Sequence, residues 1–598
     1  MKATQRLRPA RQTSVEGYVE SWSVIRPINP FIYVPIAYDT GMQSRLIEND
    51  DVLREVFKFL DPSTTEDPRL NDQTEHENNC RRALARSARV SRVLSDHALN
   101  VLWRKIEGLL DFFSILPSFR RELIEPRDDD EGYSDDEPHS KPLWRFTGPI
   151  TSLDWQRYQQ YAQRVRVLSL AWTPGKVDPA VFVEIARLSD GGPLFPGLIE
   201  LDIQTYDHLE AIPSTLISPS LRKLHATDLG DVLGDPSTKP AQAPLAELVR
   251  AAFLNARLLE DVSLEGSNVG PMENLLPMTE CTRLRRVSLV DVACDARLLS
   301  GWSRINCLGD LALEVNSNSS VGREHLEFAH LHCLTVRGDL KCLADLFAHI
   351  SAPSLNYLRI QVQQPPGHGR EQVSECFAAL SSSFGSTLRH FHLASFCDGH
   401  DRGQRWPEQP LIDIIRPLLD MHMLQTVSIT PPRWWSVTLS DEAVHDIATA
   451  WPHLVSLQIY LLNAHSTATW ESLIELASVC SNLRTLVLPQ LDLRTFAPPL
   501  ADKQPSLYHP LEVLTLDYSF AHNQVEDSHT FAQFLDRTFP NLDLGTSVIR
   551  RVDIPGGQRH PLCREVMELL RNFQQSRERQ IASSGKHVMV SSPAAQTV

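Results

Sequence analysis

The chain has 598 residues, 42% of them hydrophobic, and a formal net charge of −16 at pH 7. This acidic balance argues against a protein that binds nucleic acid or an anionic membrane, because both surfaces attract a basic face. No apolar run reaches roughly 18 residues, and no hydrophobic segment follows the Arg-containing start, so neither a membrane span nor a secretory signal is predicted. The ten cysteines are scattered without a C-x-x-C pair, which is typical of a reducing compartment, here the cytoplasm or the nucleus.

Residues 1–44 contain several prolines and neither a helical nor an alternating period. We expect a disordered or loosely ordered N-terminus. Met42 stands just before the first patterned segment, so both Met1 and Met42 are candidate starts.

Residues 45–120 have the apolar spacing of short helices. From Asp50 onward, apolar residues fall at i, i+3, i+4 and i+7, namely Leu53, Val56, Phe57 and Leu60. Residues 61–79, which contain prolines and acids, are expected to form an exposed insertion. A second helix is predicted over residues 81–94, and a third follows a cap at Ser95 or Asp96. Such short helices cannot bury their apolar stripes among themselves, so we expect surplus apolar surface to face a partner.

Three segments of this region together resemble an F-box: residues 49–60, the run Ala88-Arg89-Val90-Ser91-Arg92, and Ala98-Leu99-x-x-Leu102-Trp103. The family pattern is an apolar-acidic first helix, a V-C-R/K-x-W/F second helix and an L-W third. This variant is similar to fungal F-box proteins with leucine-rich tails, over roughly residues 46–117. It departs from the family where Leu46-Ile47-Glu48-Asn49 replaces the usual L-P, and where the insertion separates the first two helices.

The resemblance implies that the module docks on the Skp-type adaptor of a cullin–RING ubiquitin ligase. The residues assigned to the F-box, some of them internal core, are Leu53, Val56, Phe57, Leu60, Val90, Leu99, Leu102 and Trp103. Replacing both Leu53 and Val56 by Asp is therefore expected to abolish adaptor binding and to leave the rest of the chain folded.

Residues 121–145 carry two acidic runs, 128–131 and 135–137. Like charges at this density repel one another and stay solvated, so this segment is predicted to be a flexible linker.

Residues 146–580 repeat the leucine-rich phrase L-x-x-L-x-L, most clearly at residues 483–488. Copies open at Val165, Leu198, Leu221, Leu259, Leu284, Leu308, Leu331, Leu355, Leu388, Leu424, Leu454, Leu483, Leu511 and Ile549. This recurrence predicts an α/β leucine-rich-repeat solenoid, with parallel strands lining the concave face and helices outside. Helices are expected at residues 245–254, 441–450 and 470–479, a capping helix at 561–575, and a disordered tail at 581–598.

The common phosphate-binding, nucleophile and zinc-protease motifs are absent, so we expect no enzyme activity and no cofactor. The nearest metal-like cluster is Cys376, His390, His392, Cys397 and His400. His390 and His392 flank Phe391 on a predicted strand and lack the usual spacing of zinc ligands, so no metal site is predicted.

The residues between the apolar positions of each phrase are expected to line the concave face, which is where solenoids usually bind partners. This face is acidic in the early repeats and basic and aromatic in the middle ones. The candidates for substrate contact are Arg337, Tyr357, Arg359, His390, His392 and Tyr460. The sequence thus favours a substrate-recognition subunit of a ubiquitin ligase. The alternatives are a leucine-rich-repeat scaffold without a ligase role and, more remotely, an enzyme with its site near His390 and His392.

Overall fold

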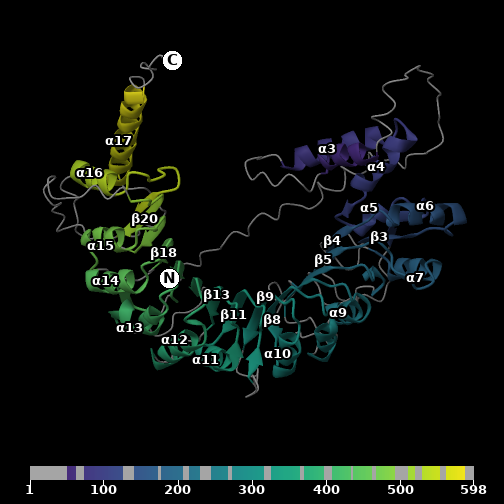
Figure 1. The fold of residues 1–598 in the computed structure, drawn as a ribbon. Helices are drawn as coiled ribbons and strands as arrows, with labels where there is room; N and C mark the ends of the chain where they lie inside the picture. The colour runs from purple at the N-terminus through teal and green to yellow at the C-terminus, as the bar shows by residue number, and fades with distance from the viewer. Residues whose placement is uncertain are drawn as a thin grey trace, which may run out of the picture. The chain divides into compact units, whose positions relative to one another are not determined.

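The computed structural model contains two compact units, shown in Figure 1: Met1–Leu259 with Asn268–Asn274 (unit 1), and Glu260–Ser267 with Leu275–Val598 (unit 2). It describes residues 50–61, 73–124, 141–172, 177–205, 214–228, 244–266, 272–315, 325–363, 370–395, 407–432, 435–460, 467–489, 491, 509–518, 528–551 and 561–585. The expected disordered N-terminus, the acidic runs and residues 586–598 of the tail lie outside these ranges.

Unit 1 begins with a helical module of α2 (Asp50–Lys58), α3 (Gln73–Ser87) and α4 (Arg92–Leu102). Its buried core consists of Leu53, Phe57, Leu84, Ala98 and Leu102. Two boundary predictions were wrong. Helix α3 begins inside the expected insertion, because its first turns are polar and lack the apolar period that was sought. It ends at Ser87, and Ser91 rather than Ser95 or Asp96 caps α4, accepting a hydrogen bond from the Leu94 amide at 3.2 Å.

The expected linker is bounded by strands. Strand β2 (Phe119–Ile124) pairs antiparallel with β3 (Lys141–Phe146), so the limits predicted at residues 121 and 145 fall within a hairpin. Before it come β1 (Lys105–Ile106) and the short helix α5 (Leu109–Phe113). Strand β1 pairs in parallel with β4 (Val167–Trp172), so the repeat sheet begins earlier than predicted, within the segment assigned to the helical module.

The remainder of unit 1 contains the first repeats. Its strands follow the order β1, β4, β5 (Glu200–Thr205) and β6 (Lys223–Asp228). The parallel register aligns Leu168 with Leu201 and Leu201 with Leu224, and all three leucines are fully buried. The helical segments between and after these strands are α6 (Ser152–Ala162), α7 (Pro179–Leu188), η3 (Ser214–Leu216), α9 (Pro244–Asn255) and η4 (Met272–Asn274).

Unit 2 is a parallel sheet with helices on its outer side, as Figure 1 shows. In sheet order its strands are β7 (Asp261–Glu265), β8 (Arg286–Ala293), β9 (Asp310–Val315), β11 (Cys333–Gly338), β13 (Tyr357–Val362), β14 (His390–Ser395), β16 (Thr426–Ile429), β18 (Ser456–Ile459), β19 (Thr485–Leu488), β20 (Val513–Tyr518) and β21 (Val548–Arg551). The helical segments are η5 (Leu276–Glu280), α10 (Ala296–Ser303), α11 (Leu340–His349), α12 (Arg370–Phe384), α13 (Leu411–Ile415), η6 (Arg416–Asp420), α14 (Asp441–Ala450), α15 (Glu471–Val479), α16 (Ser528–Thr538) and α17 (Pro561–Gly585). Two short parallel pairs join β10 (Leu326–Glu327) to β12 (Ile350–Ser351), and β15 (Gln409–Pro410) to β17 (Val437–Thr438).

The repeat phrase locates the strands accurately. Every predicted opening except Ile549 is followed two residues later by the first residue of a strand. Ile549 was wrong as an opening, because the register pairs it with Leu516, the last apolar residue of the preceding phrase. Directly before β21 stands the polar residue Ser547, which is buried and accepts a hydrogen bond from the Leu514 amide at 3.2 Å. Because Ser547 is polar where the phrase normally has an apolar residue, the apolar pattern does not reveal this copy in the sequence.

Helix α17 covers the end of the last repeats. Val566 and Leu570 are buried, and the Gln574 side chain donates to the Leu542 carbonyl at 2.7 Å. The helix runs to Gly585, so the first residues of the expected disordered tail are helical. Within the described ranges, no helix combines the length and the apolar character needed to cross a membrane.

Candidate functional site

The helical module divides the predicted F-box residues between its core and its surface. Leu53 and Phe57 of α2 and Leu102 of α4 are buried in the core. Leu60, Leu99 and Trp103 are half-buried and pack against that core. Val56 and Val90 are 50% and 72% exposed, so they are the members of the predicted set that a partner can reach. Because Leu53 is buried in the core, an Asp at this position would unfold the module itself, so the double substitution does not separate docking from folding of the module.

One face of α2 is apolar and exposed. Val52, Val56 and Phe59 are 38%, 50% and 83% exposed and follow the spacing i, i+4, i+7, which places them on one side of the helix and of the turn after it. We call these three residues the α2 stripe. Val52 and Phe59 were not among the residues predicted from the sequence, because the neighbouring stripe, which forms the core, has the same periodicity. A second apolar set at helical spacing was the signal that could have revealed them.

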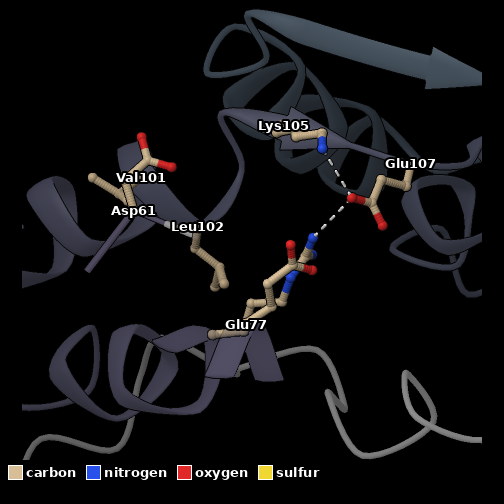
Figure 2. A pocket seen from close by; sticks show the side chains of 7 residues that line it. Asp61, Glu77, Val101, Leu102, Lys105 and Glu107 are labelled. Carbon is tan, nitrogen blue, oxygen red and sulfur yellow. Dashed lines mark ion pairs between the residues drawn. The ribbon is translucent and has the colours of Figure 1, made fainter. Parts of the chain in front are cut away.

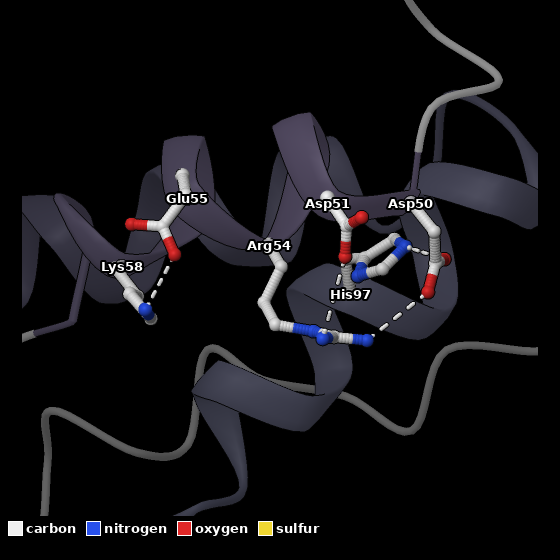
Figure 3. A network of polar contacts seen from close by, with 6 residues as sticks. All are labelled: Asp50, Asp51, Arg54, Glu55, Lys58 and His97. Carbon is white, nitrogen blue, oxygen red and sulfur yellow. Dashed lines mark hydrogen bonds and ion pairs between the residues drawn. The ribbon is translucent and has the colours of Figure 1, made fainter.

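The charged residues of α2 pair with one another, as Figure 3 shows. Arg54 lies 3.2 Å from Asp50 and 3.6 Å from Asp51, and Lys58 pairs with Glu55. At the start of the helix, Asp50 also contacts His97 of α4 at 2.8 Å, and the His97 ring stacks on Phe57 with centroids 6.3 Å apart. The Asp50–His97 contact and the stacking of His97 on Phe57 fix α2 on α4.

The module is attached to the first repeat by direct contacts. Arg164, after α6, donates to the Asp96 carboxylate at 2.9 Å and to the Asn100 side chain. Trp103, at the end of α4, lies 5.7 Å from Phe112 and 5.1 Å from Tyr161 between ring centroids. These contacts hold the module on the repeats of unit 1.

A small pocket lies at the same joint (Figure 2). Its lining residues are Asp61, Glu77, Arg81, Val101, Leu102, Lys105 and Glu107. The Glu107 carboxylate pairs with Lys105 at 3.2 Å and with Arg81 at 3.7 Å. Because these charges neutralise one another across the pocket, we interpret it as part of the joint and not as a ligand site.

On the concave face of unit 2, the early strands carry charges that are paired. Arg286 of β8 bridges Asp261 and Asp310 on the neighbouring strands, at 3.1 Å from each. Arg337 of β11 lies 2.9 Å from Asp291 and 4.0 Å from Glu314. Both arginines of the early face are therefore engaged by carboxylates, which outnumber them.

Arg337 is less exposed than the sequence predicted. It was predicted on an exposed surface but is only 9% exposed, because Asp291 and Glu314 enclose its guanidinium. Asp291 adopts a left-handed backbone, φ 57°, within an irregularity of β8, and its amide donates to Glu314 at 3.1 Å. Burial raises the pKa of Glu314, although Arg337 opposes this shift. A role for Arg337 in partner contact stays a prediction, and its evident role here is to hold two carboxylates together.

The next strands bring four candidate residues together. The parallel register sets Tyr357 beside His390 and Arg359 beside His392. The Tyr357 ring lies 5.1 Å from His392 and 6.4 Å from His390. Burial is the main cause that lowers the pKa of His392, and the nearby charge of Arg359 lowers it further. Burial also lowers the pKa of His390, with a smaller contribution from the charge of Arg389. Both imidazoles are therefore neutral at pH 7.

Tyr460 lies apart from this cluster. It directly follows β18, which is separated from β14 by β16, and its hydroxyl donates to the Gln458 side chain at 3.3 Å. Its proposed contact with a partner remains a prediction.

The histidines do not meet other metal ligands where the structure describes the chain. No group of three or more His, Cys, Asp or Glu residues there is arranged to hold a metal ion. Cys376 lies on α12, where burial raises its pKa to about 12, and it is therefore a protonated thiol of the core. Cys397 and His400 lie outside the described residues.

Comparison with known proteins gives a likeness of fold. No protein-family model and no curated protein matches the sequence. The chain is similar to an internalin from Listeria monocytogenes, with 13% identity over 63% of this chain and 91% of that one and a TM-score of 0.30. It is also similar to a leucine-rich-repeat protein from Leptospira interrogans, with 12% identity over 64% of this chain and 91% of that one and a TM-score of 0.30. A third similar structure is the complex of Rad7 and Elc1 from yeast, with 11% identity over 71% of this chain and 95% of that one and a TM-score of 0.26.

At these identities the likeness concerns the fold alone. The repeated phrase, the parallel strands in register and the outer helices make the chain an α/β leucine-rich-repeat solenoid.

Proposed function

We propose that the chain is a substrate-recognition subunit of a cullin–RING ubiquitin ligase. In this proposal the helical module docks on a Skp-type adaptor, and the concave face of the solenoid holds a protein substrate. The observation that carries it is the α2 stripe, an exposed apolar face on the first helix of a module with an F-box-like sequence. Ubiquitin transfer would belong to other subunits, so this chain would contribute binding and positioning.

The α2 stripe has the properties of a docking surface. Burying a large apolar side chain contributes roughly 1.5–3 kcal/mol, and aromatic residues are frequent anchors in interfaces. Phe59, at 83% exposure, can bury almost its whole ring on a partner. Glu55, three residues from Val52 and paired with Lys58, would stand at the polar rim, where it contributes little affinity but excludes alternative orientations.

Affinity capture of the tagged full-length chain from cells tests this proposal. The variant replaces Val56 and Phe59 by Asp, which puts two charges on the stripe and leaves the core intact. A matched control replaces Leu153 of α6 and Val183 of α7 by Asp, since these residues are 73% and 69% exposed outside the module. Wild type and control should retain the Skp-type adaptor and the cullin, and the stripe variant should lose both.

Two outcomes oppose the proposal. Equal adaptor capture by the stripe variant would show that this face is not the docking surface. Capture of a protein partner without any adaptor by the wild type would favour the scaffold without a ligase role.

A further inference from the structure

The concave face of unit 2 changes character between β11 and β13. From β7 to β11 each inward Arg is paired with two carboxylates, as shown by Arg286 and Arg337. From β13 to β19 the inward positions carry no carboxylate; they are Tyr357, Arg359, Gln361, His390, His392, Ala394, Thr426, Ser428, Ser456, Gln458, Thr485 and Val487. Crossing to β13 thus replaces arginines engaged by carboxylates with a surface rich in hydrogen-bond donors.

Arg359 supplies the permanent charge of this surface. Its side chain is exposed, and no described residue forms an ion pair or a hydrogen bond with its guanidinium. Beside it, the rings of Tyr357 and His392 lie 5.1 Å apart at an interplanar angle of 33° and form one wall. Thr335 and His392 occupy the register positions on either side of Arg359. We call Tyr357, Arg359, His390 and His392 the Arg359 patch.

We propose that the Arg359 patch binds the carboxylate of an Asp or Glu side chain in an extended segment of the protein partner. Charge complementarity carries this assignment. The guanidinium is a planar fork that matches a carboxylate, and no carboxylate among the described residues pairs with it. The hydroxyl of Tyr357 and the N–H groups of the two neutral imidazoles can donate to the same anion or to the backbone that carries it.

The charge of the patch favours a carboxylate over a phosphoryl group. With both imidazoles neutral, the patch carries one positive charge, which balances one carboxylate. A phosphoryl group carries about −1.5 to −2 charges and would be left undercompensated. Additional acids toward β9 would face Asp310 and Glu314, so we expect a single acidic residue and not an acidic run.

The sheet also sets the direction of the bound segment. In the row that contains Arg359 and His392, the next register positions are Ser428 and Gln458. These uncharged groups can exchange hydrogen bonds with a main chain that crosses the strands, which are spaced by about 4.8 Å. The segment would therefore place its acid over β13 and continue over β16 and β18.

This inference rests on the proposed function only in taking the solenoid as the partner-binding part. The test measures binding of the purified full-length chain to an array of short peptides of random sequence. Each peptide is printed in three versions, with Glu, Gln or phosphoserine at the central position. Wild type should prefer Glu over Gln by about tenfold on the peptides it binds. Arg359→Gln should remove that preference, whereas Arg571→Gln, at an exposed position of α17, should keep it.

The pH dependence gives an independent readout. The groups that face His390 and His392 are Tyr357 and Arg359 from β13, Arg389 beside β14, and the hydroxyls of Thr426 and Ser428 from β16. Lowering the pH from about 7.5 to about 5.5 begins to protonate the imidazoles while a Glu carboxylate stays ionised. Wild-type binding to the Glu peptides should therefore strengthen.

Three results would overturn the inference: no preference for Glu over Gln, a Glu preference that survives Arg359→Gln, or a stronger, Arg359-dependent preference for phosphoserine. The adaptor experiment is separate, because Arg359→Gln leaves the α2 stripe unchanged. Loss of adaptor capture with retained Glu preference would count against the ligase proposal alone.

Discussion

Phe57 and Phe59 stand two residues apart in opposite environments, and this difference gives the sharpest test of the module. Phe57 is 4% exposed and stacks on His97, whereas Phe59 is 83% exposed. Replacing a buried Phe by Ala costs about 3–5 kcal/mol of the free energy of unfolding. Replacing an exposed residue usually changes that free energy by less than about 0.5 kcal/mol. Phe57→Ala should therefore unfold or strongly loosen α2, and Phe59→Ala should leave it intact.

Hydrogen exchange of the full-length chain, followed by mass spectrometry, measures this difference directly. Peptides covering α2 and α4 should exchange at least about a hundredfold faster in Phe57→Ala and within about threefold of wild type in Phe59→Ala. Peptides from β13 and β14 provide an internal reference that should not change. Similar acceleration by both substitutions, or a larger effect of Phe59→Ala, would refute the division of the module into core and surface.

Further predictions concern the solenoid and the cap of α4. Arg337→Ala should lower the free energy of unfolding by about 1–3 kcal/mol, because it leaves the largely buried Glu314 carboxylate without its cation. Arg286→Ala, which removes an exposed cation, should cost about 0–1 kcal/mol, and urea denaturation compares the two variants. Burial lowers the pKa of His509, so the unfolded chain binds its proton more tightly, and stability near β20 should fall as the pH drops below about 6.5. His509→Gln should remove this part of the pH dependence of hydrogen exchange. Ser91→Ala should destabilise the module by about 1 kcal/mol, and Ser95→Ala should have little effect; equal effects in the same denaturation experiment would contradict the assigned cap.

The strands could be predicted from the sequence because the repeat imposes the same apolar spacing wherever a phrase enters the sheet. Leu483 and Leu486 of the clearest copy are fully buried, as the phrase requires. The prediction failed at the last repeat, where buried Ser547 interrupts the spacing and the register places Ile549 last in its phrase. It also failed at β1, whose two residues are too few to show a period.

The helical module was predicted less accurately for a different reason. Two apolar stripes run along α2, and periodicity alone cannot tell which one meets the other helices. The structure decides this through Leu84 and Ala98, which pack against Leu53 and Phe57 and leave Val56 outside. Helix α3 was placed too late because an exposed helical turn built of polar residues lacks an apolar period.

The candidate surface on the solenoid shows a similar limit. Strand alternation correctly placed Tyr357, Arg359, His390 and His392 on one face, because alternate side chains project to the same side of a sheet. It could not show that Arg337 is enclosed, since that depends on Asp291, whose left-handed backbone lies within an irregularity of another strand. Pairing across strands, and not the pattern of a single strand, decides which cation is left for a partner.

Isothermal titration of the two purified proteins tests directly whether the α2 stripe docks the chain on a Skp-type adaptor, as we propose. We expect saturable binding by the wild type and by the Leu153→Asp, Val183→Asp control. Binding by the Val56→Asp, Phe59→Asp variant should be at least about a hundredfold weaker, because two apolar contacts are replaced by charges that must be desolvated. Absence of wild-type binding, or undiminished binding by the stripe variant with α2 still protected from exchange, would contradict docking through the α2 stripe.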